Sequence, residues 1–408
     1  MLLHFTRKWD IITITKKYHL ERIGSSVERR RREETMHFKN AMIYTEDFRF
    51  QLGCFSVEDG RFTHVLGEEV PGAVDLAGAY VIPGLIDIHT HGNSGADFSD
   101  GDEEGLRRMA AYYGANGVTS FAPASMTLPY EALEKAFAVG RKVHERPDKG
   151  SARLVGINME GPFFSEKRKG AQNAAYLQKP DFEAFQKLNA ASGGLVKIVD
   201  LAPELTGAVE FAQNASEVCV VSIAHTDADY DQAKAVLDAG GSHLTHLYNA
   251  MPGIHHRTPG PIGAASEREK VYAELIADGI HSHPSAVRLA FKLFPHRICL
   301  ISDSMRACGM PEGESDLGGQ KVYIKGRKAT LADGTIAGSA TNLYDCMTTA
   351  ISFGISPEEA VRSATWNPAH ELGLLYEIGS IRNGKRADFV ICGADLSRRE
   401  VYIGGERV

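Results

Sequence analysis

The sequence predicts an α/β protein in which eight β/α units close into a (β/α)8 TIM barrel, flanked by a small β-sandwich domain formed from both chain ends. Three observations support this prediction. From Leu85 onward, short apolar runs rich in β-branched residues alternate with helical stretches. Polar side chains that can bind a metal ion or a proton stand at the ends of five of these runs. Both chain ends, in contrast, have the alternating pattern of short strands.

The first residues differ from the rest of the chain. Residues 1–36 mix apolar and basic side chains and contain four consecutive arginines, Arg29 to Arg32. We interpret this segment as a disordered, solvated extension. An arm that binds nucleic acid or a membrane is the alternative, and translation from Met36 is a further one.

Short strands are expected on both sides of the barrel. The N-terminal ones are 38–44, 48–56 and 61–67, with Asp59-Gly60 as a hairpin turn. The C-terminal ones are 379–381, 384–391 and 400–403. We therefore expect residues 37–83 and 372–408 to form one composite β-sandwich domain.

The catalytic barrel is expected to span residues 84–371. Its eight predicted strands are 85–91, 118–123, 153–160, 195–202, 218–225, 242–246, 272–277 and 298–303. The helices predicted between them are 103–113, 130–144, 181–188, 228–239 and 285–293. A long loop, 248–264, follows the sixth strand, and two further helices, 341–352 and 357–364, follow the eighth.

Composition limits the classes of function. A chain of 408 residues can form one barrel and a small second domain. Its net charge of −7 provides no basic field for nucleic acid. No apolar run reaches membrane-spanning length, so we expect no membrane association. The six cysteines have no C-x-x-C spacing and favour reduced thiols in a cytoplasmic protein.

The clearest functional signal is the pair His89 and His91 at the end of the first barrel strand. Alternate residues of a strand share a face, so both imidazoles should project together and form half of a metal site. Two histidines that cap a strand by chance are the alternative. Further polar groups end other strands, which favours the metal site: Glu160, His225, His246 and Asp303. Buried polar groups at a barrel mouth must be paired, coordinated or catalytic.

This order of residues along a barrel resembles the amidohydrolase superfamily and, within it, the family of N-acetylglucosamine-6-phosphate deacetylases. The resemblance covers roughly residues 37 to 408. Its most specific motifs are Pro83-Gly-Leu-Ile-Asp-Ile-His-Thr-His-Gly92, Glu160-Gly-Pro-Phe163, Lys169-Gly-Ala-Gln-Asn173, Leu201-Ala-Pro-Glu204, Thr245-His-Leu-Tyr-Asn-Ala-Met251, Asp278-Gly-Ile-His281, Asp333-Gly-Thr-Ile-Ala-Gly-Ser339 and Asn367-Pro-Ala369. The expected reaction is hydrolysis of the N-acetyl group of an amino-sugar phosphate.

The resemblance also implies a divalent ion, Zn²⁺ or Fe²⁺, with one or two ions per chain. Glu160, His225 and His246 would hold one ion, and His89 with His91 would complete a second site. Many related enzymes bridge their ions with a carboxylated lysine, but Lys197 lies in the middle of the fourth strand. This departure argues against a hydantoinase or a dihydroorotase.

Asp303 is expected to be the catalytic proton shuttle, with a structural carboxylate as the alternative. The positions that match the family's phosphate site are Asn249, the backbone amide of Ala250, Arg257 and His281. Some of these groups could come from a second chain, and we expect a homodimer. A solvated basic loop is the alternative for Arg257.

Gln172 stands where many family members carry a histidine that contacts the sugar or its acetyl group. An amide can donate a hydrogen bond but cannot take up a proton, so an acid role there is in doubt. Three other functions remain open: a deacetylase for the galactosamine epimer, a D-aminoacylase and a non-catalytic scaffold with the same fold.

Overall fold

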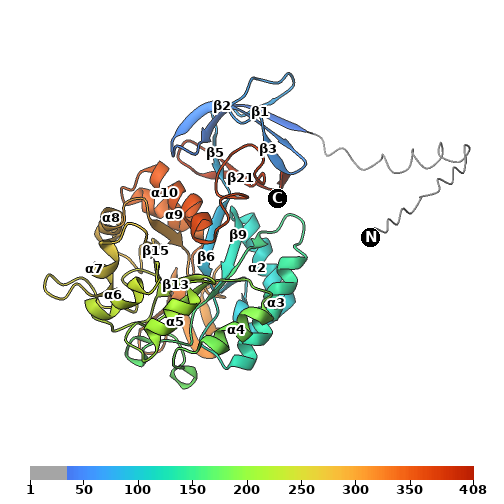
Figure 1. The fold of residues 1–408 in the computed structure, drawn as a ribbon. Helices are drawn as coiled ribbons and strands as arrows, with labels where there is room; N and C mark the ends of the chain where they lie inside the picture. The colour runs from blue at the N-terminus through green and yellow to red at the C-terminus, as the bar shows by residue number, and fades with distance from the viewer. Residues whose placement is uncertain (1–34) are drawn as a thin grey trace, which may run out of the picture. The chain divides into compact units, whose positions relative to one another are not determined.

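A closed ring of parallel strands forms the larger part of the computed structural model, which describes residues 35–408 (Figure 1). Residues 1–34 of the predicted extension lie outside the described residues, so the extension and the alternative of translation from Met36 both stay predictions. The barrel strands are β6 (Leu85–Thr90), β9 (Val118–Pro123), β10 (Arg153–Leu154), β11 (Ile157–Met159), β12 (Val196–Leu201), β13 (Val220–Ile223), β14 (His243–Leu244), β15 (Tyr272–Ile276) and β16 (Ile298–Ile301).

These strands pair in chain order, each parallel to the next, in two sheets that continue one another. The ring closes where the carboxyl ends of β6 and β16 meet. The amide of Asp303 donates to the carbonyl of His89 at 3.0 Å, and the amide of His91 donates to the carbonyl of Ser304 at 2.8 Å. The predicted TIM barrel is confirmed.

One predicted strand, 153–160, is divided in the structure. Leu154 in β10 pairs with β9, whereas Ile157 in β11 pairs with β12. Gly156 stands at the break, where a Cβ atom would lie 2.6 Å from the side chain of Lys197. The sequence pattern marks the apolar run but not this change of neighbour.

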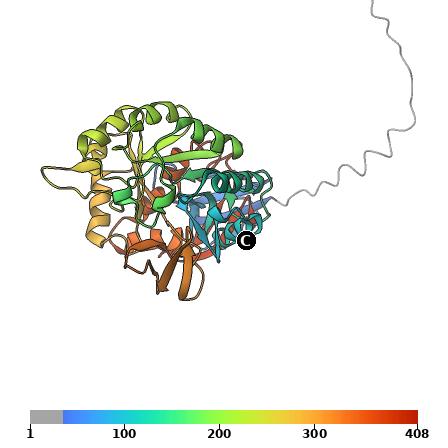
Figure 2. The same cartoon turned by 90° about the horizontal axis from the view of Figure 1, so that it is seen from below.

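Helices surround the ring, as Figure 2 shows from below. They are α2 (Glu103–Ala115), α3 (Tyr130–Glu145), α4 (Phe182–Ala191), α5 (Ala208–Ala215), α6 (Tyr230–Asp238), α7 (Gly260–Ser266), α8 (Pro284–Leu293), α9 (Leu343–Ser352), α10 (Pro357–Ala364) and α11 (Trp366–Glu371), with 3-10 turns η1 (Phe98–Asp100), η2 (Glu166–Arg168) and η3 (Ala174–Tyr176). Several begin at side chains that accept a backbone N–H, among them Asp102, Asp181 and Asp229. No helix in residues 35–408 has both the length and the apolar character needed to cross a membrane.

The two chain ends share a separate sheet. Its strands follow the order β23-β22-β21-β5-β1-β2-β3, with β4 beside β1. The bounds are β1 (Met36–Tyr44), β2 (Phe50–Glu58), β3 (Arg61–Thr63), β4 (Val74–Asp75), β5 (Tyr80–Pro83), β21 (Phe389–Cys392), β22 (Arg398–Ile403) and β23 (Glu406–Arg407). Glu58 pairs with Arg61 across the predicted Asp59-Gly60 turn.

An aromatic cluster forms the core of this sheet. The ring of Phe389, from the C-terminal part, stacks on Tyr402 at 4.4 Å and meets Phe55, from the N-terminal part, at 5.3 Å. Val390 of β21 pairs with Ile82 of β5, so the two ends are hydrogen-bonded neighbours. The predicted second domain from both ends is thus present, while its boundaries at 83 and 372 stay predictions.

A small antiparallel sheet that the sequence pattern did not reveal follows the last barrel strand. It consists of β17 (Gly313–Leu317), β18 (Gln320–Lys325), β19 (Lys328–Thr330) and β20 (Ile336–Ser339). The short pair β7 (Gly92–Asn93) and β8 (Ala96–Asp97) lies after β6. Leu317 and Ile336 line the cavity described below, so this insertion forms part of the site's wall.

Candidate active site at the carboxyl ends of the barrel strands

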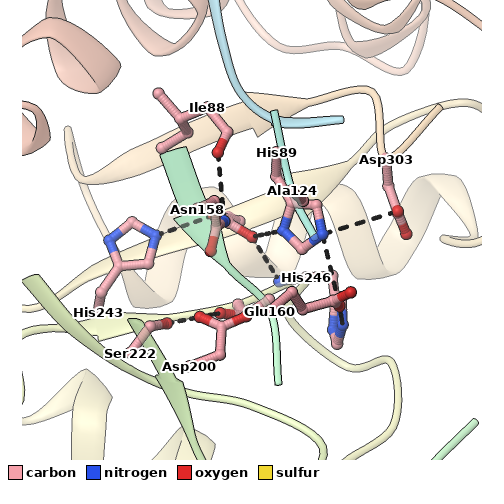
Figure 3. A network of polar contacts seen from close by, with 12 residues as sticks. Ile88, His89, Ala124, Asn158, Glu160, Asp200, Ser222, His243, His246 and Asp303 are labelled. Carbon is pink, nitrogen blue, oxygen red and sulfur yellow. Dashed lines mark hydrogen bonds and ion pairs between the residues drawn. The ribbon is translucent and has the colours of Figure 1, made fainter. Parts of the chain in front are cut away.

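Glu160 stands at the centre of the predicted site (Figure 3). It follows β11, and its Oε1 lies 3.1 Å from Nε2 of His225 and 3.3 Å from Nε2 of His246. Its Oε2 lies 3.3 Å from Nε2 of His91. Because parallel strands end at the same edge of the barrel, residues from β6, β11, β13 and β14 meet around one carboxylate.

Asp303, after β16, completes the group. Its Oδ1 lies 3.3 Å from Nε2 of His91 and 3.8 Å from Nε2 of His89. The side chains fall into two sets of three buried donors, within each of which all donor atoms lie within 4.8 Å of one another: Glu160, His225 and His246, and His89, His91 and Asp303. All six residues predicted at the metal site and the proton shuttle therefore converge.

The second nitrogen of each of three histidines has its own partner. Nδ1 of His89 lies 2.8 Å from Oε2 of Glu274, Nδ1 of His91 lies 3.2 Å from the carbonyl of Ala124, and Nδ1 of His225 lies 2.9 Å from the carbonyl of Arg168. An Nδ1–H that donates outward leaves the Nε2 lone pair directed at the centre.

This arrangement fits a divalent ion. Nε2 of His89 is buried and has no hydrogen-bond partner among residues 35–408, although it faces Glu160 at 3.5 Å. Imidazole and carboxylate donors of this kind suit zinc and also accept ferrous iron. The residues present therefore fit a divalent ion.

The carboxylates and histidines of the site shift one another's pKa values. Burial raises the pKa of Glu160, but the surrounding histidines, His91 first, hold it well below its ordinary value. Burial would raise the pKa of Asp303, but the neighbouring His91 and His89 lower it below its ordinary value. Burial lowers the pKa of His91, but Glu160 and Asp303 raise it to about 8. Both carboxylates are thus ionised at neutral pH.

Four of the predicted site residues have left-handed backbone conformations: φ is 42° at His225, 28° at His246, 50° at Ala250 and 47° at Asp303. A positive φ costs energy for a residue with a side chain, and such residues gather at functional sites. His225, His246 and Asp303 each lie two residues after the end of a barrel strand, in the turn that follows it.

A cavity of about 400 Å³ opens beside these residues. Its wall includes most of the predicted substrate-binding residues: Gln172, Asn249, Ala250 and His281. Two basic residues that the sequence reasoning missed also line it, Lys167 and Arg168. Both pair with Asp227. Their signal was the short basic run after Glu166, which has no fixed spacing to the metal ligands.

Arg257 lies elsewhere. It is exposed on the loop before α7, its Nη1 contacts Nε2 of His256 at 2.8 Å, and it does not line the cavity of its own chain. Within one chain, the structure therefore brings together every predicted site residue except Arg257.

The sequence reasoning also missed a set of buried polar residues behind the site. Glu274, His243 and Asp200 lie inside barrel strands and are fully buried. Burial, followed by the charge of Glu274, raises the pKa of Asp200 to about 8. The available sequence signal for Asp200 and Glu274 was a single carboxylate within a mostly apolar predicted strand.

Comparison with known proteins agrees with the geometry. Residues 80–408 match the model of the amidohydrolase family. An N-acetylglucosamine-6-phosphate deacetylase from Bacillus subtilis is 38% identical over 89% of this chain and 94% of its own length. An N-acetylgalactosamine-6-phosphate deacetylase from Escherichia coli O157:H7 is 33% identical over 83% of this chain and 90% of its own.

Solved structures give the same result. N-acetylglucosamine-6-phosphate deacetylase from Pasteurella multocida matches with a TM-score of 0.86 and 27% identity, over 92% of this chain and 99% of that one. The enzyme of that name from Mycobacterium smegmatis matches with a TM-score of 0.84 and 32% identity over the same shares. The resemblance stated from the motifs is confirmed, and the chain belongs to the amidohydrolase family, in its branch of amino-sugar-phosphate deacetylases.

Proposed function

We propose that this enzyme hydrolyses the N-acetyl group of N-acetyl-D-glucosamine 6-phosphate and releases D-glucosamine 6-phosphate and acetate. The observation that carries the proposal is the convergence of the two donor sets, one of which includes Asp303, at a cavity of about 400 Å³. Curated relatives with this activity in their names span most of the chain. A cavity of this size accommodates one phosphorylated monosaccharide.

Glu160, His225 and His246 would hold one divalent ion, and His89 with His91 would hold a second, with Glu160 shared between them. We assign the ions as Zn²⁺ or Fe²⁺. When bound, such an ion acts as a Lewis acid that acidifies water and polarises the amide carbonyl. Glu160 contacts both donor sets: its Oε1 faces His89, His225 and His246, and its Oε2 faces His91.

Asp303 is the residue that moves the proton. Its carboxylate is ionised and lies beside His89 and His91, so it can accept a proton from the attacking water. The protonated Asp303 then delivers this proton to the sugar nitrogen when the amide C–N bond breaks. One group therefore serves both halves of the reaction, and the leaving amine departs neutral.

Asn249, the amide of Ala250 and His281 would bind the phosphate, because all three residues line the cavity. Arg257 cannot join them within its own chain. We propose that it reaches the phosphate site of a second chain in a homodimer.

No disulfide joins the cysteines of residues 35–408, which is compatible with action in the cytoplasm.

Deacetylation of N-acetylgalactosamine 6-phosphate is the second candidate, because one relative with 33% identity carries that name. The two substrates differ only in the configuration of one hydroxyl group. The same site chemistry serves both, and the choice depends on the groups that contact this hydroxyl.

Acetate release from the two epimers tests the proposal. We expect the glucosamine epimer to give the higher kcat/KM, and a chelator to abolish release until Zn²⁺ or Fe²⁺ is restored. Release that persists at full rate after exhaustive chelation would refute the metal-dependent mechanism. A higher kcat/KM for the galactosamine epimer would replace the first candidate with the second.

A further inference from the structure

A buried carboxylate, Glu274, contacts one residue from each of the two donor sets. It lies in β15, on the same face as Tyr272 and Ile276, which belong to the apolar cluster inside the barrel. Its side chain is 0% exposed. Burying an ionised carboxylate among apolar side chains is costly unless hydrogen bonds and opposite charges compensate for it. The partners of Glu274 therefore indicate what it does.

One oxygen of Glu274 serves two metal-ligand residues at once. Its Oε2 accepts from Nδ1 of His89 at 2.8 Å and from the backbone amide of His246 at 3.1 Å. His89 comes from β6 and His246 follows β14, so these residues belong to different donor sets. A single acceptor atom thus fixes an imidazole of one set and the backbone of the other.

The other oxygen of Glu274 faces a second buried histidine. Oε1 lies 3.4 Å from Nε2 of His243, and Nδ1 of His243 lies 2.7 Å from Oε2 of Glu371. Neither Oε1 of Glu274 nor Nε2 of His243 has a hydrogen-bond partner among the described residues, so this contact is an ion-pair distance only. The carboxylate is positioned mainly by the two hydrogen bonds that its Oε2 accepts.

We infer that Glu274 is a positioning residue for the metal centre: it orients the imidazole of His89 and the backbone of His246 so that both Nε2 atoms face Glu160. With the Nδ1–H of His89 donated to Glu274, Nε2 keeps its lone pair. That atom is one of several buried side-chain nitrogens without a hydrogen-bond partner among the described residues, and it faces Oε1 of Glu160 at 3.5 Å. This inference rests on the proposed function only in taking His89 as a metal ligand.

Two substitutions separate geometry from charge. In Glu274→Gln, the amide oxygen can replace Oε2 as acceptor, and the NH₂ group can donate to Nε2 of His243. Glu274→Asp keeps the charge but withdraws the acceptor by one methylene. Loss of such an outer partner typically weakens metal binding by about 10- to 100-fold.

The test is the number and affinity of Zn²⁺ ions per chain, measured by equilibrium dialysis at buffered metal concentrations without substrate. We expect Glu274→Asp to weaken the ion on the His89 and His91 side by about 10- to 100-fold, and Glu274→Gln to weaken it by less than about tenfold. Asp388→Asn is the matched control, since Asp388 is a buried carboxylate that pairs with Arg386 and contacts neither Glu274 nor a proposed metal ligand, and this variant should bind zinc as the wild type does.

An aspartate variant that binds like the wild type, a glutamine variant as weak as the aspartate variant, or a control that is equally weakened would each overturn the inference. Histidine-selective nitrogen NMR of the zinc-loaded wild type gives an answer that needs no variant to fold. His89 should carry its proton on Nδ1 and its metal on Nε2, and the opposite arrangement would contradict the assignment. A chain with the expected ranking that releases no acetate would refute the proposed function but not the role of Glu274.

Discussion

The side-chain amide of Gln172 donates a hydrogen bond of 2.7 Å to Oε2 of Glu160. The carbonyl oxygen of the same amide accepts from the backbone of Thr127 at 2.7 Å, so the orientation of the amide is fixed from both ends. Gln172 is nearly fully buried. A residue that the sequence suggested for the substrate thus also orients the central carboxylate of the site.

Replacing Gln172 with alanine should lower kcat/KM roughly 10- to 150-fold, because a hydrogen bond to a charged group contributes about 1.5–3 kcal/mol. Steady-state kinetics on the phosphorylated sugar measures this loss. Gln172→His is the control: it keeps a donor and should recover much of the activity, while adding an ionisation near pH ~6.5 to the rate profile. An alanine variant with unchanged kcat/KM would show that the hydrogen bond from Gln172 to Glu160 does not contribute to catalysis.

The proton-shuttle assignment predicts a large effect at Asp303. Asp303→Asn cannot accept the proton of the water, so kcat should fall by at least about 100-fold while substrate binding changes little. Rapid-quench or steady-state measurements of acetate release give kcat. KM or a direct binding measurement gives the affinity for the substrate. Retention of about a tenth of the wild-type kcat would rule out the shuttle.

The pH dependence of phosphate binding should follow His281. Its Nδ1 lies 2.7 Å from Oδ2 of Asp278. Burial lowers the pKa of His281, but the hydrogen bond and charge of Asp278 outweigh it and raise the pKa above its ordinary value of 6.5. A raised pKa means that the cation is present at lower pH and is lost as the pH rises through that pKa.

KM for the phosphorylated sugar should therefore increase as the pH rises above the pKa of His281, whereas KM for the unphosphorylated sugar should stay constant. The second pKa of a phosphate is about 6, so the substrate is already a dianion in this range and the change belongs to the enzyme. Asp278→Asn should move the increase to lower pH. Parallel KM profiles for the two sugars would contradict this role of His281.

The shared sheet of the two chain ends predicts a stability effect. Phe389 is fully buried against Phe55 and Tyr402, so Phe389→Ala should lower the free energy of unfolding by about 3–5 kcal/mol. Tyr376, which is 76% exposed, provides the control. Tyr376→Ala should change the free energy of unfolding by less than about 0.5 kcal/mol. Chemical denaturation measures both, and equal effects would show that the aromatic cluster does not stabilise the fold.

The barrel and the convergence of its ligands followed from the sequence because strand-end residues are marked by position. Glu160, His225 and His246 each end an apolar run, and parallel strands place such ends together. The sequence could not show Glu274 as a partner of His89, since the two residues are 185 positions apart and meet only when the ring closes.

Other features depended on packing that no local pattern encodes. The sheet from β17 to β20 consists of short, largely polar strands without a distinctive period, and its core forms against Met305 and Met126 of the barrel loops. Arg257 had the right chemistry for phosphate, but it does not line the cavity of its own chain and contacts His256 instead. The sequence shows that a side chain can bind phosphate, but only the folded structure shows whether it lies close enough to the cavity to do so.

The most direct test of the account compares kcat/KM for N-acetylglucosamine 6-phosphate with that for the unphosphorylated sugar. Two charge-assisted contacts to the phosphate, from His281 and from Arg257 of a second chain, contribute about 1.5–3 kcal/mol each. We therefore predict an advantage of roughly 10²- to 10⁴-fold for the phosphorylated sugar. Hydrolysis of both sugars within about fivefold, a difference of only ~1 kcal/mol, would contradict the account and leave a general amidohydrolase in its place.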